Sequence, residues 1–280
     1  MDNSYRIESF QHNGMAFPFD LNEELSDPET QYFEFQEKAL KLLGNPVTLK
    51  PNLLSKFFYK LSMDSSIIKE VKKIIGEDIY IWSSAFFPKK PGGGKIVSYH
   101  QDNPYWQLTT DNVVTAWIAL TDSNKENGAL EIVPGSSKYG LIKNLDVDNP
   151  REAYLKGLKT TDSNDLLSYK QGLEDFIKKN KPEIIKLKTS QFSIHHVNSV
   201  HGSGVNNSSG YRIGYAVRYI SSNTKHKIEN IDSAIHVCGK KNDYFVDEVR
   251  PEEDFGEKEI VNYKKAMKAT GAFGNKSYSK

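Results

Sequence analysis

Two residues that could do chemistry, His100 and Asp102, stand one residue apart in the stretch 94–134. This stretch is rich in β-branched and aromatic residues, which favours strand. Side chains at positions i and i+2 of a strand point to the same face, so this imidazole and this carboxylate can bind one ion together. They supply two ligands of a metal site, which is complete only if the chain supplies a third.

A third ligand is available at His201, far downstream in the segment 192–219, FSIHHVNSVHGSGVNNSSGYRIGYAVRY. Two imidazoles and one carboxylate can occupy one face of an octahedral Fe(II) ion and leave the other positions for substrate and oxygen. His195 and His196 are weaker candidates, because adjacent strand residues face opposite ways and neither precedes the small turn-forming residues that follow His201. Cys238 is the single cysteine, so a site built from several thiolates is excluded.

The motifs around these residues are more specific than the ligand types alone. A His-x-Asp pair begins at His100, AWIALTDSNKENGALEIVPGSS covers 116–137, HGSG begins at His201, and Arg212 follows that histidine by eleven residues. Together these motifs resemble the phytanoyl-CoA dioxygenase family of Fe(II)- and 2-oxoglutarate-dependent oxygenases. The likeness covers roughly residues 10–220.

The resemblance implies a fold, a set of cofactors and a role for each motif residue. The fold would be mainly β, a cupin-like double-stranded β-helix or jelly roll with flanking helices and the metal at one open end. His100, Asp102 and His201 would be the catalytic metal ligands for Fe(II), with 2-oxoglutarate as cosubstrate and O2 as oxidant. Arg212 would pair with the distal carboxylate of 2-oxoglutarate, and Ser203 would donate a hydrogen bond to the same carboxylate.

Four further residues receive roles from their place in these motifs. Gln101 and Trp117 correspond to positions that contact the cosubstrate in the family, and Trp106 is a candidate wall of the substrate pocket. One of His195 and His196 is expected to face the barrel interior near the metal. We assign His196 as the substrate contact, although structural packing explains either histidine equally well.

The elements that must position these residues are predicted from periodicity. Helices are expected over 28–43, 53–61 and 65–75, because their apolar residues recur every three or four positions and would pack against a sheet. A strand or hairpin is expected over 5–19 around Asn13-Gly14. Further strands are predicted at 79–87, 113–120, 129–133, 184–187, 191–196 and 212–220.

The chain shows no repeat and no linker, so one domain over 1–280 is expected. The stretch 139–181 differs from the rest, because it is polar and has helical fragments but no strong strand. An insertion of this length between strands is predicted to be either a lid over the site or surface decoration.

The overall composition indicates which kinds of molecule the protein can bind. With Lys+Arg 37 against Asp+Glu 36 the net charge is +1, which gives no electrostatic case for nucleic acid or an anionic membrane. No stretch approaches the length of a membrane span, and the polar start has no signal-peptide core. The single cysteine fits a reducing compartment. We therefore expect a cytoplasmic protein that acts on a small molecule.

The predicted function is a 2-oxoglutarate-dependent dioxygenase that hydroxylates a small polar metabolite, such as an amino acid or a phosphonate. Asp102 favours hydroxylation, since related halogenases replace this carboxylate with a small residue. The segments 88–95, 103–110 and 139–181 are candidates for lining the substrate pocket. They are rich in Lys, Tyr and Asn, which favours a polar or anionic substrate over a long acyl chain. Three alternatives stay open: a non-catalytic jelly-roll protein that binds metal and 2-oxoglutarate, a natural-product tailoring oxygenase that desaturates or cyclises, and a hydrolase or isomerase using another metal.

Overall fold

Two β-sheets face each other in the computed structural model, which describes residues 3–106, 108–142, 164–167, 172–227 and 232–269. The larger sheet contains, in spatial order, β1 (Met15–Asp20), β7 (Gln191–His196), β4 (Val113–Ala119), β9 (Arg212–Ser221), β2 (Ile79–Lys89), β10 (Ser233–Cys238) and β11 (Val246–Asp247). The smaller sheet contains β3 (Val97–His100), β8 (His201–Ser203), β5 (Leu130–Ile132) and β6 (Glu183–Ile184). Trp117 and Ala216 of the larger sheet share an apolar cluster with Leu130 and Ile132 of the smaller one, so the sheets pack face to face.

The central strands of the larger sheet are buried along their whole length. Every residue of β4 and β9 is buried. Their sequences therefore do not alternate between apolar and polar residues as a half-exposed strand would. On one face Ala116 and Val217 pack beneath helices, and on the other Trp117 faces the smaller sheet. The inner face is therefore the only place on these strands where a polar side chain can meet a ligand.

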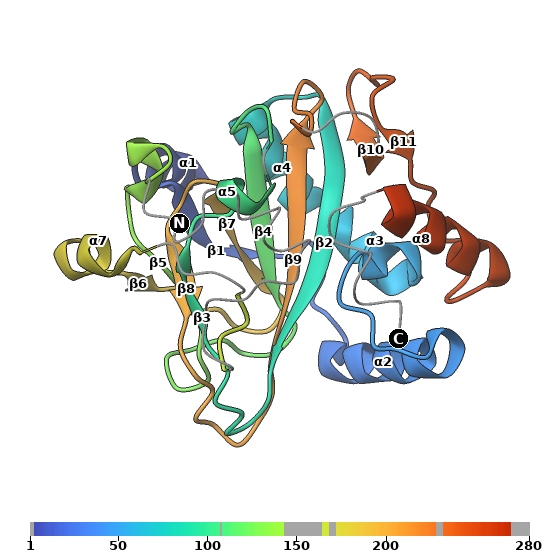
Figure 1. Cartoon of the computed structure of the whole chain (residues 1–280), viewed down its shortest axis with the longest axis horizontal. Helices are drawn as coiled ribbons and strands as arrows, with labels where there is room; N and C mark the ends of the chain where they lie inside the picture. The colour runs from blue at the N-terminus through green and yellow to red at the C-terminus, as the bar shows by residue number, and fades with distance from the viewer. Residues whose placement is uncertain (1–2, 107, 143–163, 168–171, 228–231, 270–280) are drawn as a thin grey trace.

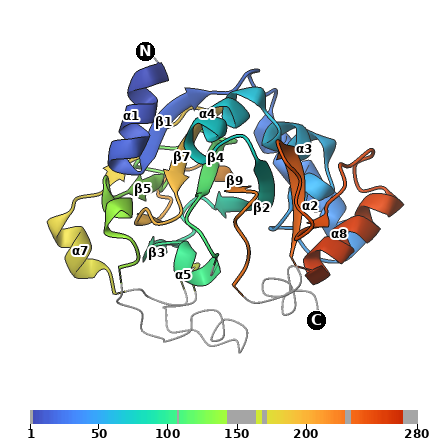
Figure 2. The same ribbon diagram turned by 90° about the horizontal axis from the view of Figure 1, so that it is seen from above.

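Helices cover the outer face of the larger sheet, as their apolar stripes predict. α2 (Pro28–Leu43), α3 (Lys56–Ser62) and α4 (Ser65–Ile75) contribute Phe35, Phe58 and Ile67 to one core with Tyr215 of β9. Figure 1 shows α2 and α3 on one side of the larger sheet and the smaller sheet on the other, and Figure 2 gives the same arrangement from above.

The predicted helix ends are confirmed where local capping decides them. Asp27 accepts a hydrogen bond from Thr30 N at the start of α2, and Gly44 ends that helix with φ 77°. Asp64 accepts from Ser66 N at the start of α4. The helix predicted over 53–61 begins later, because a single 3-10 turn, η1 (Pro51–Leu53), precedes α3.

One expectation about the start of the chain is wrong, and the end of the chain carries elements that were not predicted. The first part of 5–19 is helix α1 (Asn3–Asn13) rather than a strand, and β1 pairs with β7 instead of closing a hairpin. The polar tail that follows β9 also carries structure, since it forms β10, β11 and helix α8 (Glu257–Ala269). The strand that pairs with each of these segments is remote in sequence, since β1 pairs with β7 and β10 with β2. A local sequence pattern therefore does not predict the pairing.

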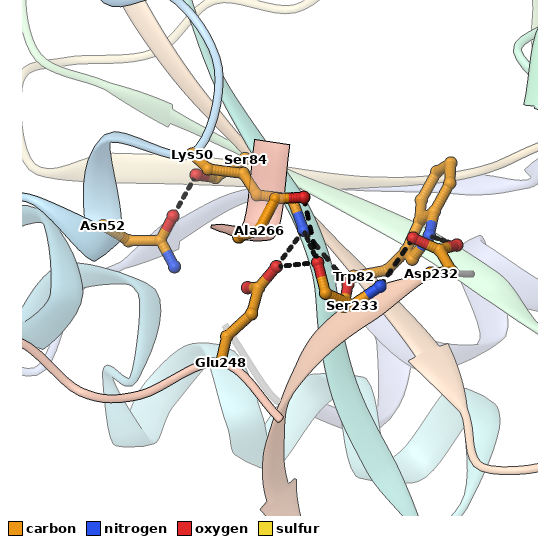
Figure 3. A network of polar contacts seen from close by, with 8 residues as sticks. All are labelled: Lys50, Asn52, Trp82, Ser84, Asp232, Ser233, Glu248 and Ala266. Atoms are coloured by element: carbon orange, nitrogen blue, oxygen red, sulfur yellow. Dashed lines mark hydrogen bonds and ion pairs between the residues drawn. The ribbon is translucent and has the colours of Figure 1, made fainter. Parts of the chain in front are cut away.

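A buried polar network fastens this tail to the larger sheet (Figure 3). Lys50 Nζ forms an ion pair with Glu248 and donates to the carbonyl oxygen of Ser233 at 3.0 Å. The Trp82 indole of β2 donates to Asp232, just before β10. These contacts hold the tail against strand β2.

The remaining described elements are η2 (Ser136–Tyr139), α5 (Asn103–Trp106) and α7 (Glu174–Lys179). Most of the predicted lid falls on 143–163 and 168–171, which lie outside the described residues. The lid and the single domain over 1–280 therefore stay predictions. None of the helices within the described ranges is long and apolar enough to cross a membrane.

Candidate metal centre

The three predicted metal ligands meet at the smaller sheet. His100 ends β3 and lies directly opposite His201, which begins β8. Asp102 Oδ1 is 3.4 Å from His100 Nε2 and 3.9 Å from His201 Nε2. All three side chains are buried, and their ligand atoms lie within 4.8 Å of one another. Residues on two paired strands therefore converge on a point that one ion can occupy.

Backbone carbonyl groups orient both imidazoles. His100 Nδ1 lies 2.9 Å from the carbonyl oxygen of Ser98, and His201 Nδ1 lies 2.9 Å from that of Ser199. An Nδ1–H that donates to a carbonyl leaves the Nε2 lone pair available for a metal. Both Nε2 atoms are the ones that face Asp102, so the tautomer suits ligation.

Electrostatics hold these groups in the protonation states that a metal needs. Burial alone would raise the pKa of Asp102, but the nearby His201, His100 and Arg218 outweigh it and hold that pKa well below its usual range. Burial and the charge of His100 lower the pKa of His201 to about 4. At neutral pH the site presents a carboxylate and a neutral imidazole, and metal binding does not have to displace protons from them.

The donor set fits Fe(II). Two imidazole nitrogens and one hard carboxylate form the facial triad typical of non-haem iron, with positions left open. Cys238, the one thiol, donates to the carbonyl oxygen of Glu77 and does not line the cavity beside the cluster.

A cavity of about 460 Å³ lies beside the cluster, and Arg212 lines it at the start of β9. The Arg212 guanidinium donates to the carbonyl oxygens of Phe87 (3.1 Å) and Gly128 (2.9 Å). Its Nε has no hydrogen-bond partner among the described residues. Burial lowers the pKa of Arg212 to about 9, so it remains a cation at neutral pH. This fixed and incompletely paired cation suits a carboxylate.

Two other predicted cosubstrate contacts lie beside Arg212. The Trp117 ring centroid is 5.4 Å from the Arg212 Cζ, which places an indole against the guanidinium. Ser203 of β8 is buried and also lines the cavity. The structure therefore brings Arg212, Trp117 and Ser203 to one cavity with the metal cluster.

Lys89 belongs to the candidate pocket segment 88–95 and lines the cavity, although no individual role was predicted for it. It lies opposite Arg212 across β2 and β9, and its Nζ donates to the carbonyl oxygens of Lys95 and Ser203, each at 3.1 Å, and to that of Gly204. Burial and the charge of Arg212 lower the pKa of Lys89 to about 7. The one available signal was a lysine at the end of the apolar run of β2.

Gln101 and His196 are not brought to the cavity. Gln101 Nε2 donates to the carbonyl oxygens of Gly140 and Asn198, each at 2.7 Å, so its amide is engaged by the backbone. His196 faces away, and its Nδ1 accepts from Asn198 N. His195 lines the cavity instead, with its ring 4.9 Å from that of His201. Alternation along β7 thus selects His195 as the inward-facing histidine, against our assignment.

Trp106 of α5 lines the cavity beside the cluster, and its contact with the substrate stays a prediction. Its ring packs against Trp82, with centroids 5.3 Å apart, and it lies over the Arg218 guanidinium at 5.3 Å. The cavity wall at Trp106 thus combines aromatic rings with a guanidinium group.

His195 is also part of the cavity wall. Burial and the charge of His201 lower the pKa of His195 well below its usual range.

Comparison with known proteins now decides the family. The sequence pattern of the family described as phytanoyl-CoA dioxygenase matches residues 6–214. This chain belongs to the phytanoyl-CoA dioxygenase family. The match includes the metal cluster and Arg212, and it confirms the family inferred from the motifs.

Two of the relatives are dioxygenases whose names give a small substrate. The chain is 28% identical to a probable alpha-ketoglutarate-dependent hypophosphite dioxygenase of Stutzerimonas stutzeri, over 68% of this chain and 63% of that protein. It is 27% identical to ectoine dioxygenase of Streptomyces coelicolor, over 55% of this chain and 51% of that protein. The chain thus spans between half and two thirds of the length of these two relatives.

Solved structures share the fold. The non-haem monooxygenase ThoJ in its nickel complex superposes with a TM-score of 0.72 at 21% identity, covering 94% of this chain and 96% of that one. The alpha-ketoglutarate-dependent carbocyclase SnoK gives a TM-score of 0.63 at 17% identity, covering 81% and 86%. The jelly-roll fold expected for the family is therefore confirmed.

Proposed function

We propose that this chain is an Fe(II)- and 2-oxoglutarate-dependent dioxygenase that hydroxylates a small polar or anionic metabolite. One observation carries the proposal: the cluster of His100, Asp102 and His201 shares a single cavity with the buried Arg212. A metal ligand set and a carboxylate-binding cation are the two features that this chemistry requires together.

Each residue has a defined task in that reaction. His100, Asp102 and His201 would hold Fe(II), which with 2-oxoglutarate and O2 supplies the oxidation of a substrate C–H bond. Arg212 and Ser203 would hold the distal carboxylate of 2-oxoglutarate and so orient its other end toward the cluster. The backbone carbonyl groups that hold the Arg212 guanidinium preorganise it, which limits the ordering needed on binding.

Asp102 favours hydroxylation within this class, because it keeps the carboxylate that halogenases related to the family lack. Desaturation or ring closure, as in a natural-product tailoring oxygenase, uses the same residues. Product mass separates the outcomes, since hydroxylation adds an oxygen atom whereas desaturation and ring closure each remove two hydrogen atoms.

The substrate class is supported by the composition of the candidate pocket segments and by the names of two relatives. Hypophosphite and ectoine, named for two relatives, are both small and polar. The single cysteine of this chain supports a cytoplasmic location. The name of another relative, phytanoyl-CoA dioxygenase of Arabidopsis thaliana, instead favours an acyl-CoA, so an acyl-CoA is included among the compounds to be tested.

Anaerobic addition of Fe(II) and 2-oxoglutarate tests the proposal directly. A weak visible charge-transfer band should appear in the wild-type protein and be lost in Asp102→Ala. Succinate formation is then measured with amino acids, phosphorus oxyanions and an acyl-CoA. Absence of the band with iron bound would overturn the cosubstrate role. A band without succinate from any compound would favour a non-catalytic binding protein, and O2-independent turnover with Zn(II) or Mn(II) a hydrolase or isomerase.

A further inference from the structure

A row of three polar side chains crosses the inner face of the larger sheet. Thr115 of β4 is in register with His195 of β7 on one side and with Arg218 of β9 on the other. These three strands are neighbours in the sheet (Figure 1). Residues in register on adjacent strands share a face, and all three line the cavity beside the metal cluster. We call them the polar row.

Each member of the polar row has a buried polar atom with no hydrogen-bond partner. These atoms are Thr115 Oγ1, His195 Nδ1 and Arg218 Nε, as judged over the described residues. The side chains are 2%, 2% and 9% exposed, respectively. An unpaired buried polar group destabilises a fold, and three of them on one line of a rigid sheet indicate a place where a ligand completes the hydrogen bonding.

Arg218 gives the row a positive charge that is separate from the three cluster residues and from Arg212. It lies six residues beyond Arg212 on the same face of β9, about 20 Å along the strand. Arg218 lines the same cavity as the metal cluster. Both guanidinium groups approach Phe87, since Arg212 donates to its carbonyl oxygen at 3.1 Å and the Arg218 Cζ lies 5.5 Å from its ring centroid. The two cations therefore reach the cavity as separate charges from two positions on one strand.

Aromatic rings fix the Arg218 guanidinium in place. Its Cζ lies 5.3 Å from the Trp106 ring centroid and 5.5 Å from that of Phe87. Stacking on two rings restrains the plane of the guanidinium without occupying its N–H groups.

We propose that the polar row of His195, Thr115 and Arg218 binds an oxyanion group of the primary substrate, with the rest of the substrate held against the metal cluster. The guanidinium supplies charge and paired N–H donors, and the threonine hydroxyl and the imidazole supply single hydrogen bonds. His195 lies against His201, so a group bound at the row is next to a metal ligand. The identity of this molecule as a substrate rests on the proposed function.

The test separates oxyanion binding at the row from cosubstrate binding at Arg212. Protein loaded with Co(II) and saturated with 2-oxoglutarate is titrated with inorganic phosphite and, separately, with acetate, by calorimetry and by tryptophan fluorescence. Fluorescence reports on the row because Trp106 lies over Arg218. We expect at least one of the two anions to bind with a stoichiometry of one. Phosphite alone would indicate a phosphorus oxyanion substrate and acetate alone a carboxylate.

Variants locate the binding. Arg218→Met should weaken it by about tenfold or more, as expected for the loss of a charge-assisted hydrogen bond. Thr115→Val, which keeps the shape of the side chain, should weaken it by several-fold. Ser193→Ala is the matched control, because Ser193 is also buried and unpaired on this sheet face but lies outside the cavity lining. Equal anion affinity in wild type, Arg218→Met and Thr115→Val would overturn the proposal.

Two further outcomes keep this inference distinct from the proposed function. Arg212→Met should lose 2-oxoglutarate binding and retain anion binding, which would support the polar row even if no turnover were found. Loss of 2-oxoglutarate binding in Arg218→Met, with anion binding displaced by 2-oxoglutarate in the wild type, would assign Arg218 to the cosubstrate and overturn the inference.

Discussion

The indole of Trp117 lies directly against Gly214 of the neighbouring strand β9. A Cβ at position 214 would fall 2.0 Å from Trp117 Cζ2, well inside any permitted contact. The same indole lies 5.4 Å from the Arg212 guanidinium. The missing side chain at Gly214 is therefore what allows the tryptophan to lie beside the proposed carboxylate-binding arginine.

Gly214→Ala should disturb the cosubstrate site, because the added methyl group displaces the indole from Arg212. We expect the 2-oxoglutarate concentration needed for half-maximal binding to rise about tenfold, with a loss of about 1–3 kcal/mol in stability from overpacking. Titration of the charge-transfer band measures the first and urea unfolding the second. Gly210→Ala is the control, since a Cβ there meets nothing within 4 Å.

Asp102→Ala should abolish metal binding, because two neutral imidazoles are left to hold the ion. The affinity for Fe(II) or Co(II) should fall by more than about 100-fold, beyond the usual effect of losing a hydrogen bond to a ligand. Metal titration followed by optical spectroscopy measures this. Asp111→Ala removes an exposed carboxylate instead and should leave metal affinity unchanged. Equal metal affinity in Asp102→Ala would remove Asp102 from the ligand set.

Arg212→Lys should weaken 2-oxoglutarate binding while leaving metal binding intact. A lysine keeps the charge but loses the planar donor pair, so we expect a loss of roughly tenfold to 100-fold in cosubstrate affinity. Calorimetry on the metal-loaded protein gives this value. Arg250→Lys, at an exposed position, is the matched control. Unchanged 2-oxoglutarate affinity would contradict the assigned role.

The buried Lys89 should make stability depend on pH in the alkaline range. Its pKa is about 7 in the folded chain and 10.5 ordinarily, because burial and Arg212 disfavour the charged form. Between these values the unfolded chain binds the extra proton, so the Lys89 contribution to stability rises with pH. The free energy of unfolding of wild type relative to Lys89→Met should increase by up to about 1.4 kcal/mol per pH unit from about pH 7 to 10.

Urea titrations at several pH values test this sign, with Lys90→Met as the exposed lysine control. A difference between wild type and Lys89→Met that stays flat or falls over this pH range would show that the Lys89 ammonium is not disfavoured in the folded chain.

Glu248→Ala should destabilise the fold strongly, because it leaves Lys50 buried without its counter-ion (Figure 3). We expect a loss of about 3–5 kcal/mol in the free energy of unfolding, measured by urea denaturation. Glu23→Ala removes the partner of Lys60 in an exposed ion pair and should leave stability nearly unchanged. A similar small effect for both variants would show that the network of Figure 3 does not anchor the tail.

The sequence by itself predicted the three residues that form the cluster, His100, Asp102 and His201, and it determined the helix ends. The spacing of His100 and Asp102 places two ligands together, and the HGSG motif marks His201. Asp27 and Gly44 bound a helix through hydrogen bonds that reach only a few residues. Such features are determined within one element and need no knowledge of its partner.

Only the tertiary structure decided which polar groups face the cavity. His195 rather than His196 points inward because β7 pairs with β4 in a register that places it beside Thr115. The register between strands that are remote in sequence cannot be predicted from the local sequence. A shift of one residue would move every side chain of the strand to the opposite face of the sheet. The same long-range pairing brings Lys89 and Arg218 to the cavity and engages Gln101 with the backbone, so these assignments had to await the folded chain.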